Sequence, residues 1–259
     1  MTWSFFLPYA LCAGTCWIAG AFLAFRNKRN WAVCLSGLGS VIFLSFIVGL
    51  WFGLERPPLR TMGETRLWYS FFLSVIGIAI YVRYKYRWIL SFSTLMSVVF
   101  ICINLFKPEI HSKTLMPALQ SIWFVPHVIV YMFSYAMMGA ATLFVIYLWF
   151  RKTPDEATDE ELSVCDVLVR IGWSFLTLGM TMGALWAKEA WGDYWTWDPK
   201  ETWAFATWIS YLIYLHLRPS YKNQQVLFFW LVFSFILLQM CWWGINFLPS
   251  AQGASIHTY

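Results

Sequence analysis

One short segment of the sequence concentrates side chains that could bind a large planar ligand. Between positions 186 and 208, charged residues alternate with Tyr194 and six tryptophans, namely Trp186, Trp191, Trp195, Trp197, Trp203 and Trp208. Aromatic rings give broad contact at a low cost in conformational entropy, and they stack on other π surfaces. An interfacial aromatic belt is the alternative explanation. Belt residues are usually scattered along a chain, so the clustering favours an aromatic platform for a ligand.

The charged residues of the same segment suggest two different roles. Lys188 and Lys200 are candidates for contacting carboxylates of a bound ligand. Asp198 and Glu201 flank Pro199, which places an acceptor at the N-cap, proline at the first helical position and glutamate at the third. This capping box predicts a helix that begins near Pro199. The two acids are explained at least in part by the cap, and their charge would oppose an anionic ligand.

Histidines supply the groups that could ligate a metal. The sequence has four, and His127 follows Pro126, which suits the first turn of a helix. His257 lies near the end of the sequence, and a tail histidine often has no role. A hydrogen-bonded interfacial residue is likewise the plain alternative for His127. Two imidazoles beside an aromatic platform are, however, the parts required for a haem with two histidine ligands.

His216 is separated from the tryptophan-rich segment by one helix length. It follows Asp198 by 18 residues, or about 27 Å of helix axis. One helix would then carry the tryptophans at one end and a histidine at the other. A histidine within a membrane span is costly unless it has a role. Two roles remain open for His216: it is either a metal ligand or a residue that forms a hydrogen bond to a neighbouring helix.

The elements that must position these residues are membrane helices. The chain has 259 residues, of which 60% are hydrophobic and 12% charged, and its mean hydropathy is +0.59; soluble domains carry about 25% charged residues. Backbone groups in lipid must be satisfied internally, so the spans should be helical. We expect an all-α, polytopic membrane protein with about eight spans, at residues 4–25, 31–54, 67–84, 88–106, 126–150, 167–187, 199–217 and 226–247.

The first apolar run and the cysteines exclude several other interpretations of the sequence. The run from Phe5 to Phe25 lacks a positively charged segment before it, so we interpret it as a retained first helix and not as a signal peptide. No CxxC pair occurs among the six cysteines, which excludes a thioredoxin-type site and a covalent c-type haem site in this chain. Most cysteines lie in apolar runs and should be small buried hydrophobes.

Positive charge predicts the orientation of the chain. With the N-terminus outside, 11 of the 18 lysines and arginines fall in inner loops. This arrangement places both termini and the tryptophan-rich segment on the outer side. The net charge of +5 is distributed over short loops between spans, which fits a membrane topology better than nucleic-acid binding.

The organisation of the chain follows from these spans. We expect one membrane domain, 1–259, whose N-terminal part, 1–110, holds four helices and no recognised motif. The part 111–259 would handle the ligand, with its tryptophan-rich loop at 186–203. No role is assigned to His111.

Sequence motifs in the second part carry a family resemblance. The stretch WGDYWTWDPKETW at 191–203 resembles the WWD signature of the CcsA (ResC) family of cytochrome c biogenesis proteins. The stretch LQSIWFVPHVIVYMFSYA at 119–136 resembles that family's first outer-histidine segment, and SIHTY at the end resembles its second. The resemblance runs from about Pro117 to the end of the sequence, and the tail departs from the family pattern around His257.

The resemblance implies a cytochrome c haem lyase subunit of the System II type, acting with a CcsB (ResB)-type membrane partner. Haem b would cross the bacterial inner membrane or the thylakoid membrane and be presented on the outer face to the CxxCH segment of apocytochrome c. His127 and His257 would be the outer axial ligands, and His216 an inner ligand whose opposite comes from the partner. The porphyrin would be held by the tryptophan-rich segment, through Trp186, Lys188, Trp191, Tyr194, Trp195, Trp197, Asp198, Lys200 and Trp203.

Other functions compete with this interpretation. A haem exporter would deliver haem to a separate chaperone without attachment chemistry. A membrane cytochrome b would need paired histidines within spans, whereas this sequence supplies only His216. A solute carrier lacks support because no inverted repeat or broken-helix pattern is visible.

Overall fold

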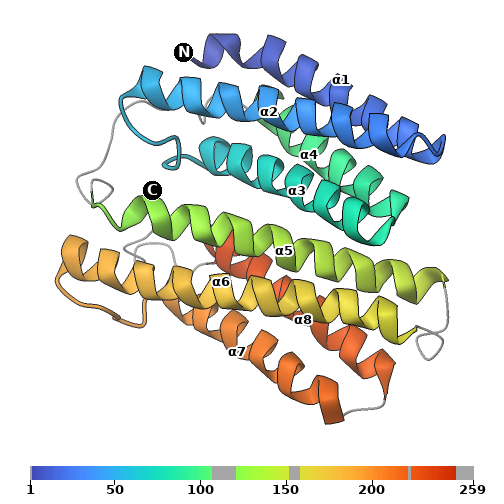
Figure 1. Ribbon diagram of the computed structural model, residues 1–259. Coiled ribbons are helices and arrows are strands. Elements are labelled where there is room, and N and C mark those ends of the chain that lie inside the picture. Colours follow the sequence, from blue (N-terminus) through green and yellow to red (C-terminus); the bar gives the residue numbers. More distant parts are fainter. Residues whose placement is uncertain (1, 107–120, 152–157, 221–222, 249–259) are drawn as a thin grey trace. The chain divides into compact units, whose positions relative to one another are not determined.

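The computed structural model describes residues 2–106, 121–151, 158–220 and 223–248, and those residues form helices joined by short connections (Figure 1). Within these ranges there are eight α-helices: α1 (Phe6–Phe25), α2 (Arg29–Leu54), α3 (Met62–Tyr84), α4 (Arg87–Phe106), α5 (Phe124–Arg151), α6 (Asp159–Trp191), α7 (Pro199–Ser220) and α8 (Gln224–Trp242). Two 3-10 helices, η1 (Trp3–Phe5) and η5 (Gly244–Phe247), flank the first and the last of them. The expected all-α fold class is confirmed.

Seven of the eight described helices are long and apolar enough to cross a membrane. Their outward faces carry large apolar side chains, such as Phe52 and Phe150, which are 78% and 89% exposed. Lipid is the solvent in which such faces are stable. The remaining helix, α7, has 22 residues, or about 33 Å, and so has the length of a span. Its tryptophan, tyrosine and threonine residues give it a more polar composition than the other seven.

The chain divides into two compact units, Met1–Gln120 and Ser121–Tyr259. In the first unit, α1 packs against α2 and α4, and α3 packs against α2 and α4, which closes a four-helix bundle. Its interior is filled by fully buried side chains of α2 such as Phe43, Phe46 and Leu50. Small polar side chains connect the helices, because the Trp17 indole donates to Ser40 Oγ at 3.1 Å and Ser40 contacts Ser74 Oγ at 2.9 Å.

A buried carboxylate orders the connection between α2 and α3. The Glu64 side chain is fully buried and forms a two-pronged ion pair with Arg56, at 2.8 and 3.0 Å. It also accepts from the backbone N–H groups of Arg60 and Thr61, at 2.6 and 3.2 Å. The Thr61 hydroxyl accepts in return from Glu64 N, which completes a capping box at the start of α3.

The second unit is also a four-helix bundle, in which α5 packs against α6 and α8, and α7 packs against the same two helices. Hydrogen bonds between helices fix its register. The Trp208 indole of α7 donates to Thr177 Oγ1 of α6 at 2.8 Å, and the Trp230 indole of α8 donates to the Ser210 carbonyl of α7 at 2.8 Å. Such polar contacts hold helices together where lipid provides no hydrophobic driving force between them.

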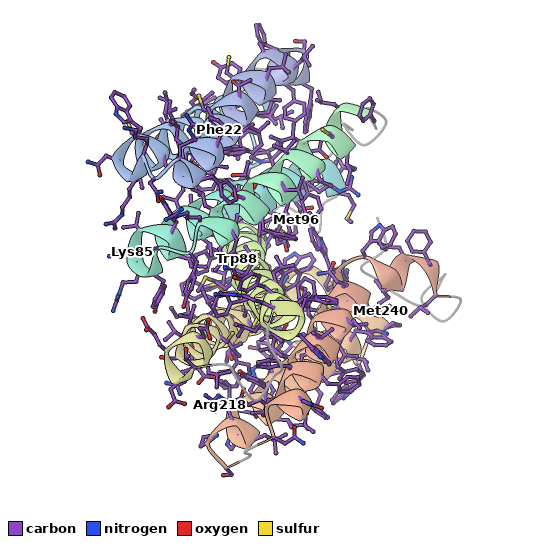
Figure 2. The ribbon with its side chains drawn as sticks, turned by 90° about the vertical axis from the view of Figure 1, so that its right-hand side faces the viewer. Phe22, Lys85, Trp88, Met96, Arg218 and Met240 are labelled. Atoms are coloured by element: carbon purple, nitrogen blue, oxygen red, sulfur yellow. The ribbon has the colours of Figure 1, made fainter. Side chains whose placement is uncertain are left out.

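The four helices of this unit run antiparallel, so its two ends differ in chemistry. One end contains the starts of α5 and α7 and the ends of α6 and α8, and we call it the Trp-rich end. Near the opposite end, Arg218 pairs with Asp166 at 3.1 Å. Figure 2 shows Arg218 near that opposite end and Met240 near the Trp-rich end of the bundle. Of the predicted ligand-binding residues that the structure describes, His216 therefore lies near the Arg218 end of the bundle, and the others lie at the Trp-rich end.

Helix boundaries differ from the predicted spans mainly at α6. This helix begins at Asp159, eight residues before the span predicted from residue 167. A capping box between Thr158 and Glu161 starts it early, with Glu161 N donating to Thr158 Oγ1 at 3.3 Å. The polar residues before the apolar run are helical because the cap satisfies their backbone. The last helix ends at Trp242, five residues before the predicted end, and a short 3-10 turn follows.

Candidate functional site

The tryptophan-rich segment is only partly a loop. Helix α6 continues to Trp191, so Trp186 and Lys188 lie on its last turns, and the loop itself covers 192–198. Gly192 ends the helix with φ +94°, a left-handed conformation that glycine adopts without strain. The Lys188 ammonium donates to the Gly192 carbonyl at 2.5 Å and lies 5.3 Å from the centre of the Tyr194 ring. Lys188 therefore closes the helix end, and its exposed side chain lies at the surface of the segment.

The predicted cap of α7 is confirmed. Lys200 N donates to Asp198 Oδ1 at 2.7 Å, and Asp198 N donates to Glu201 Oε2 at 3.2 Å. Glu201 reaches further back and accepts from Thr196 N at 2.8 Å. Asp198 and Glu201 are 6% and 9% exposed, so both carboxylates are occupied with backbone donors. They fix the shape of the loop and do not form an open acidic site.

Trp197 has a strained backbone and an exposed ring. Its φ is +59°, in the left-handed region that costs a non-glycine residue roughly 1–2 kcal/mol. Its side chain is 61% exposed. The ring makes edge contacts with Trp195 at 5.7 Å and Phe205 at 5.5 Å between centroids. The loop thus holds a large apolar ring on its surface at a cost in backbone strain.

Trp195 contributes a buried donor without an acceptor. Its ring is half-buried between Trp197 and Phe205. Among the described residues, no group accepts a hydrogen bond from its buried indole Nε1. A buried donor that stays unpaired costs about 1–3 kcal/mol. A ligand carboxylate would remove that cost, so Trp195 suits a site for an anionic aromatic molecule.

His127 lies in the first turn of α5, as predicted, and its ring packs against α6. Nδ1 lies 2.8 Å from the Gly179 carbonyl oxygen. Because a carbonyl can only accept, Nδ1 carries the proton, and the neutral ring has its lone pair on Nε2. This is the arrangement of histidines that ligate metals, whose other nitrogen commonly donates to a carbonyl or carboxylate.

Aromatic rings enclose the imidazole of His127. Tyr131 packs against it edge-on at 4.5 Å, and Trp186 lies at 5.6 Å. Trp186 is only 3% exposed and also contacts Trp191 at 4.8 Å and Phe124 at 5.2 Å. Trp186 therefore supports the histidine from within the bundle. The Trp186 ring itself lies inside the bundle and not on its surface.

Two further candidates, Lys200 and Trp203, lie in the first turns of α7 and are half-buried. The Lys200 carbonyl accepts from Cys241 Sγ of α8 at 3.7 Å, which ties the start of α7 to the end of α8. The described part of the chain brings His127, Trp186 and Trp191 into one set of ring contacts, and Trp195 and Trp197 into another with Phe205.

His216 lies near the opposite end of α7, away from these rings. It is exposed, and its Nδ1 lies 2.9 Å from the Leu212 carbonyl of the same helix. The predicted separation is confirmed, because one helix holds both Pro199 and His216. A bond to a neighbouring helix, which was one alternative for His216, is absent from the hydrogen bonds of the described residues. His257 and His111 lie outside the described residues.

Three residues near the predicted site were not predicted from the sequence, because their role depends on packing. Tyr131, Gly179 and Phe205 all contact predicted site residues. The spacing of four between His127 and Tyr131 was an available signal, because such residues share a helix face. Gly179 and Gly183 form a GxxxG pattern, which is typical of close helix contacts in membranes.

Comparison with known proteins gives one consistent result. The family model described as cytochrome C assembly protein matches residues 9–251. The chain is 31% identical to the cytochrome c biogenesis protein CcsA of Phalaenopsis aphrodite subsp. formosana, covering 83% of this chain and 82% of that protein. It is 31% identical to CcsA of Panax ginseng, over 88% and 82% of the two chains. CcsA of Chlamydomonas reinhardtii is 29% identical, over 95% and 73%.

Proposed function

Because this chain belongs to the cytochrome c assembly family, with CcsA proteins of cytochrome c biogenesis among its relatives, we propose that it is the haem-presenting subunit of a cytochrome c haem lyase. Membership of the family establishes a role in cytochrome c maturation. The lyase activity, the ligands and the partner are our proposal.

The observation that carries this proposal is the hydrogen bond from His127 Nδ1 to the Gly179 carbonyl at 2.8 Å. It leaves the iron-binding lone pair on Nε2, in a ring fixed beside the aromatic residues of the Trp-rich end. The unpaired indole donor of Trp195 and the exposed ring of Trp197 fit the two other parts of haem, a propionate and a porphyrin face. The residues of this end therefore suit haem b as the substrate.

In this proposal His127 and His257 supply the axial ligands on the outer face. Trp191, Tyr194, Trp195, Trp197 and Trp203 hold the porphyrin, while Lys188 and Lys200 contact the propionates. Trp186 supports His127, and Asp198 holds the loop in shape through the cap of α7. His216 serves as an inner ligand, with its opposite supplied by a CcsB (ResB)-type partner. The exposed position of His216 suits a ligand shared with another protein.

The chemistry in this proposal depends on positioning. Haem supplies two vinyl groups, and each cysteine thiol of the CxxCH segment adds its sulfur and hydrogen across one vinyl double bond to give a thioether. No side chain at the Trp-rich end stands out as a general acid or base among the described residues. We assign the rate enhancement to holding the reactants together, which can be worth several kcal/mol.

Orientation and location belong to the same proposal. The distribution of positive charge supports an outer-facing Trp-rich end, in the bacterial inner membrane or the thylakoid membrane. The rival function is a haem exporter that passes haem to a chaperone. It would use the same ligands, so only the product distinguishes the two.

The test uses the full chain with its partner and a CxxCH reporter cytochrome. The His127→Ala variant should lose most of its bound haem, and the characteristic low-spin absorption of a haem with two histidine ligands should disappear. Free imidazole should restore part of the bound haem and of its low-spin absorption. Wild-type haem content in this variant would refute the ligand assignment. Haem delivery without any thioether product in the wild-type complex would favour the exporter.

A further inference from the structure

We infer that Gly183 positions the iron-binding nitrogen of His127, by leaving open the space through which the imidazole reaches the Gly179 carbonyl. The consequence for haem rests on the function proposed above. The positioning itself is a property of the chain without any ligand.

The two glycines lie one turn apart on α6, at positions 179 and 183. A Cβ atom at position 183 would lie 2.6 Å from His127 Cε1 and 2.8 Å from Nδ1. Real Cβ atoms do not approach other atoms so closely. In a helix, the Cα–Cβ bond tilts toward the N-terminus, so a side chain covers the turn that precedes its own position. Any residue larger than glycine at 183 would therefore cover the carbonyl that His127 uses.

The second glycine serves the neighbouring ring. A Cβ at position 179 would lie 2.5 Å from Tyr131 Cδ1 and 2.7 Å from Cε1. Tyr131 packs edge-on against His127 at 4.5 Å. The pair of glycines thus accommodates two successive rings of α5, at positions 127 and 131, and the two rings support one another. The close packing of α5 on α6 is what brings an imidazole within hydrogen-bond distance of a helix carbonyl.

The hydrogen bond has a chemical consequence at the far side of the ring. Donation from Nδ1 to a carbonyl fixes the tautomer and raises the basicity of Nε2 toward a metal. A histidine without this bond can place its proton on Nε2, and in that tautomer Nε2 has no lone pair for iron. Loss of the group that accepts a hydrogen bond from a metal-ligating histidine typically lowers metal affinity by about 10- to 100-fold. Gly183 is therefore a positioning residue that acts through His127.

The experiment compares Gly183→Ala with Gly37→Ala and Gly14→Ala in the first unit. Gly37 and Gly14 have nothing within 4 Å of an added Cβ, so they control for the helix propensity of alanine. The first measurement is the ¹⁵N spectrum of the haem-free, histidine-labelled protein, with the His127 signals assigned by their loss in His127→Ala. Wild type and both controls should show the proton on Nδ1. Gly183→Ala should show it redistributed toward Nε2.

The second measurement is haem affinity, together with the absorption spectrum of the bound haem. Gly183→Ala should weaken binding by about 10- to 100-fold, whereas the two controls should match wild type. In a His127→Ala background, adding Gly183→Ala should have no further effect, since the residue acts through the histidine.

The outcomes separate this inference from the proposed function. If His127→Ala keeps its haem, the ligand assignment fails, and the ¹⁵N spectrum still tests the positioning. If Gly183→Ala leaves both the tautomer and the haem affinity unchanged, the inference is overturned. Should Gly183→Ala fail to fold, the wild-type spectrum decides, because a His127 proton on Nε2 in the haem-free protein contradicts the hydrogen bond.

Discussion

The conformation of Trp197 allows backbone strain and ligand contact to be measured separately. Its φ of +59° and its 61% exposed ring occur in the same residue. We compare two variants that both remove the ring, Trp197→Gly and Trp197→Ala, and predict that their order of stability is the reverse of the usual one. Trp197→Gly relieves the strain, whereas Trp197→Ala retains it.

The magnitude follows from two opposing terms. A left-handed conformation costs an alanine roughly 1–2 kcal/mol more than a glycine. Glycine loses about 0.5–1 kcal/mol more conformational entropy than alanine on folding. Trp197→Gly should therefore be more stable than Trp197→Ala by about 0.5–1 kcal/mol. This is the reverse of the order expected at an ordinary position, where alanine is the more stable of the two.

Both variants should bind haem equally weakly under the proposed function. Each loses one stacking ring, which is worth about 0.5–1.5 kcal/mol, or roughly a 2- to 10-fold weaker affinity. The contacts with Trp195 and Phe205 are lost in both, so they cancel in the comparison. Trp31→Ala is the matched control, because Trp31 is 66% exposed on α2 of the other unit.

The assay is thermal unfolding of the purified protein in detergent, followed by haem titration of each variant. Equal stability of the glycine and alanine variants would refute the strain argument. Wild-type haem affinity in both would remove Trp197 from the site. A loss of affinity in Trp31→Ala of the same size would show that exposed tryptophans act through general membrane contact.

Three further predictions concern the groups that hold the two units in shape. Glu201→Ala should destabilise the second unit by about 2–3 kcal/mol and expose the loop 192–198 to proteolysis, because Asp198 N and Thr196 N lose their acceptor; an unchanged melting temperature would contradict this role of the cap. Asp166→Leu should cost about 2 kcal/mol, since Arg218 and Tyr214 lose a shared partner that is 13% exposed. Adding Arg218→Met should recover part of that loss, and a purely additive double variant would argue against the pair. Glu64→Gln should cost about 3–5 kcal/mol in the first unit, because it leaves the Arg56 charge buried without its partner. The exposed neighbour Glu55 provides the control, and its Glu55→Gln variant should unfold at the wild-type temperature.

Much of the fold could be predicted because its signals are local. Apolar runs of about 20 residues in lipid can only be helices, and seven of the eight described helices meet that criterion. The cap at Asp198 was predicted to the residue, because a capping box involves only four consecutive positions. The end of α6 was harder to predict from the sequence, since the last helical turns carry the same aromatic and charged residue types as the loop that follows.

The candidate site was predicted as a set of residue types and not as an arrangement. Trp186 and Trp197 belong to one sequence cluster, yet the first is 3% exposed and the second 61%. The burial of Trp186 follows from its contacts with α5. The exposure of Trp197 follows from a backbone conformation that sequence preferences would assign to glycine. Neither cause is visible in the residue types alone.

The amino-acid sequence by itself determined that the chain spans a membrane, which segments form its helices, and that one helix separates the tryptophans from His216. These follow from hydropathy and from the fixed rise per residue of a helix. Only the tertiary structure decided which nitrogen of His127 carries the proton. Its partner, Gly179, is 52 positions away, and the contact exists because two glycines let α5 approach α6. A hydrogen bond between two helices depends on how they pack, and helix packing is set by all the side chains at the contact and not by any one segment.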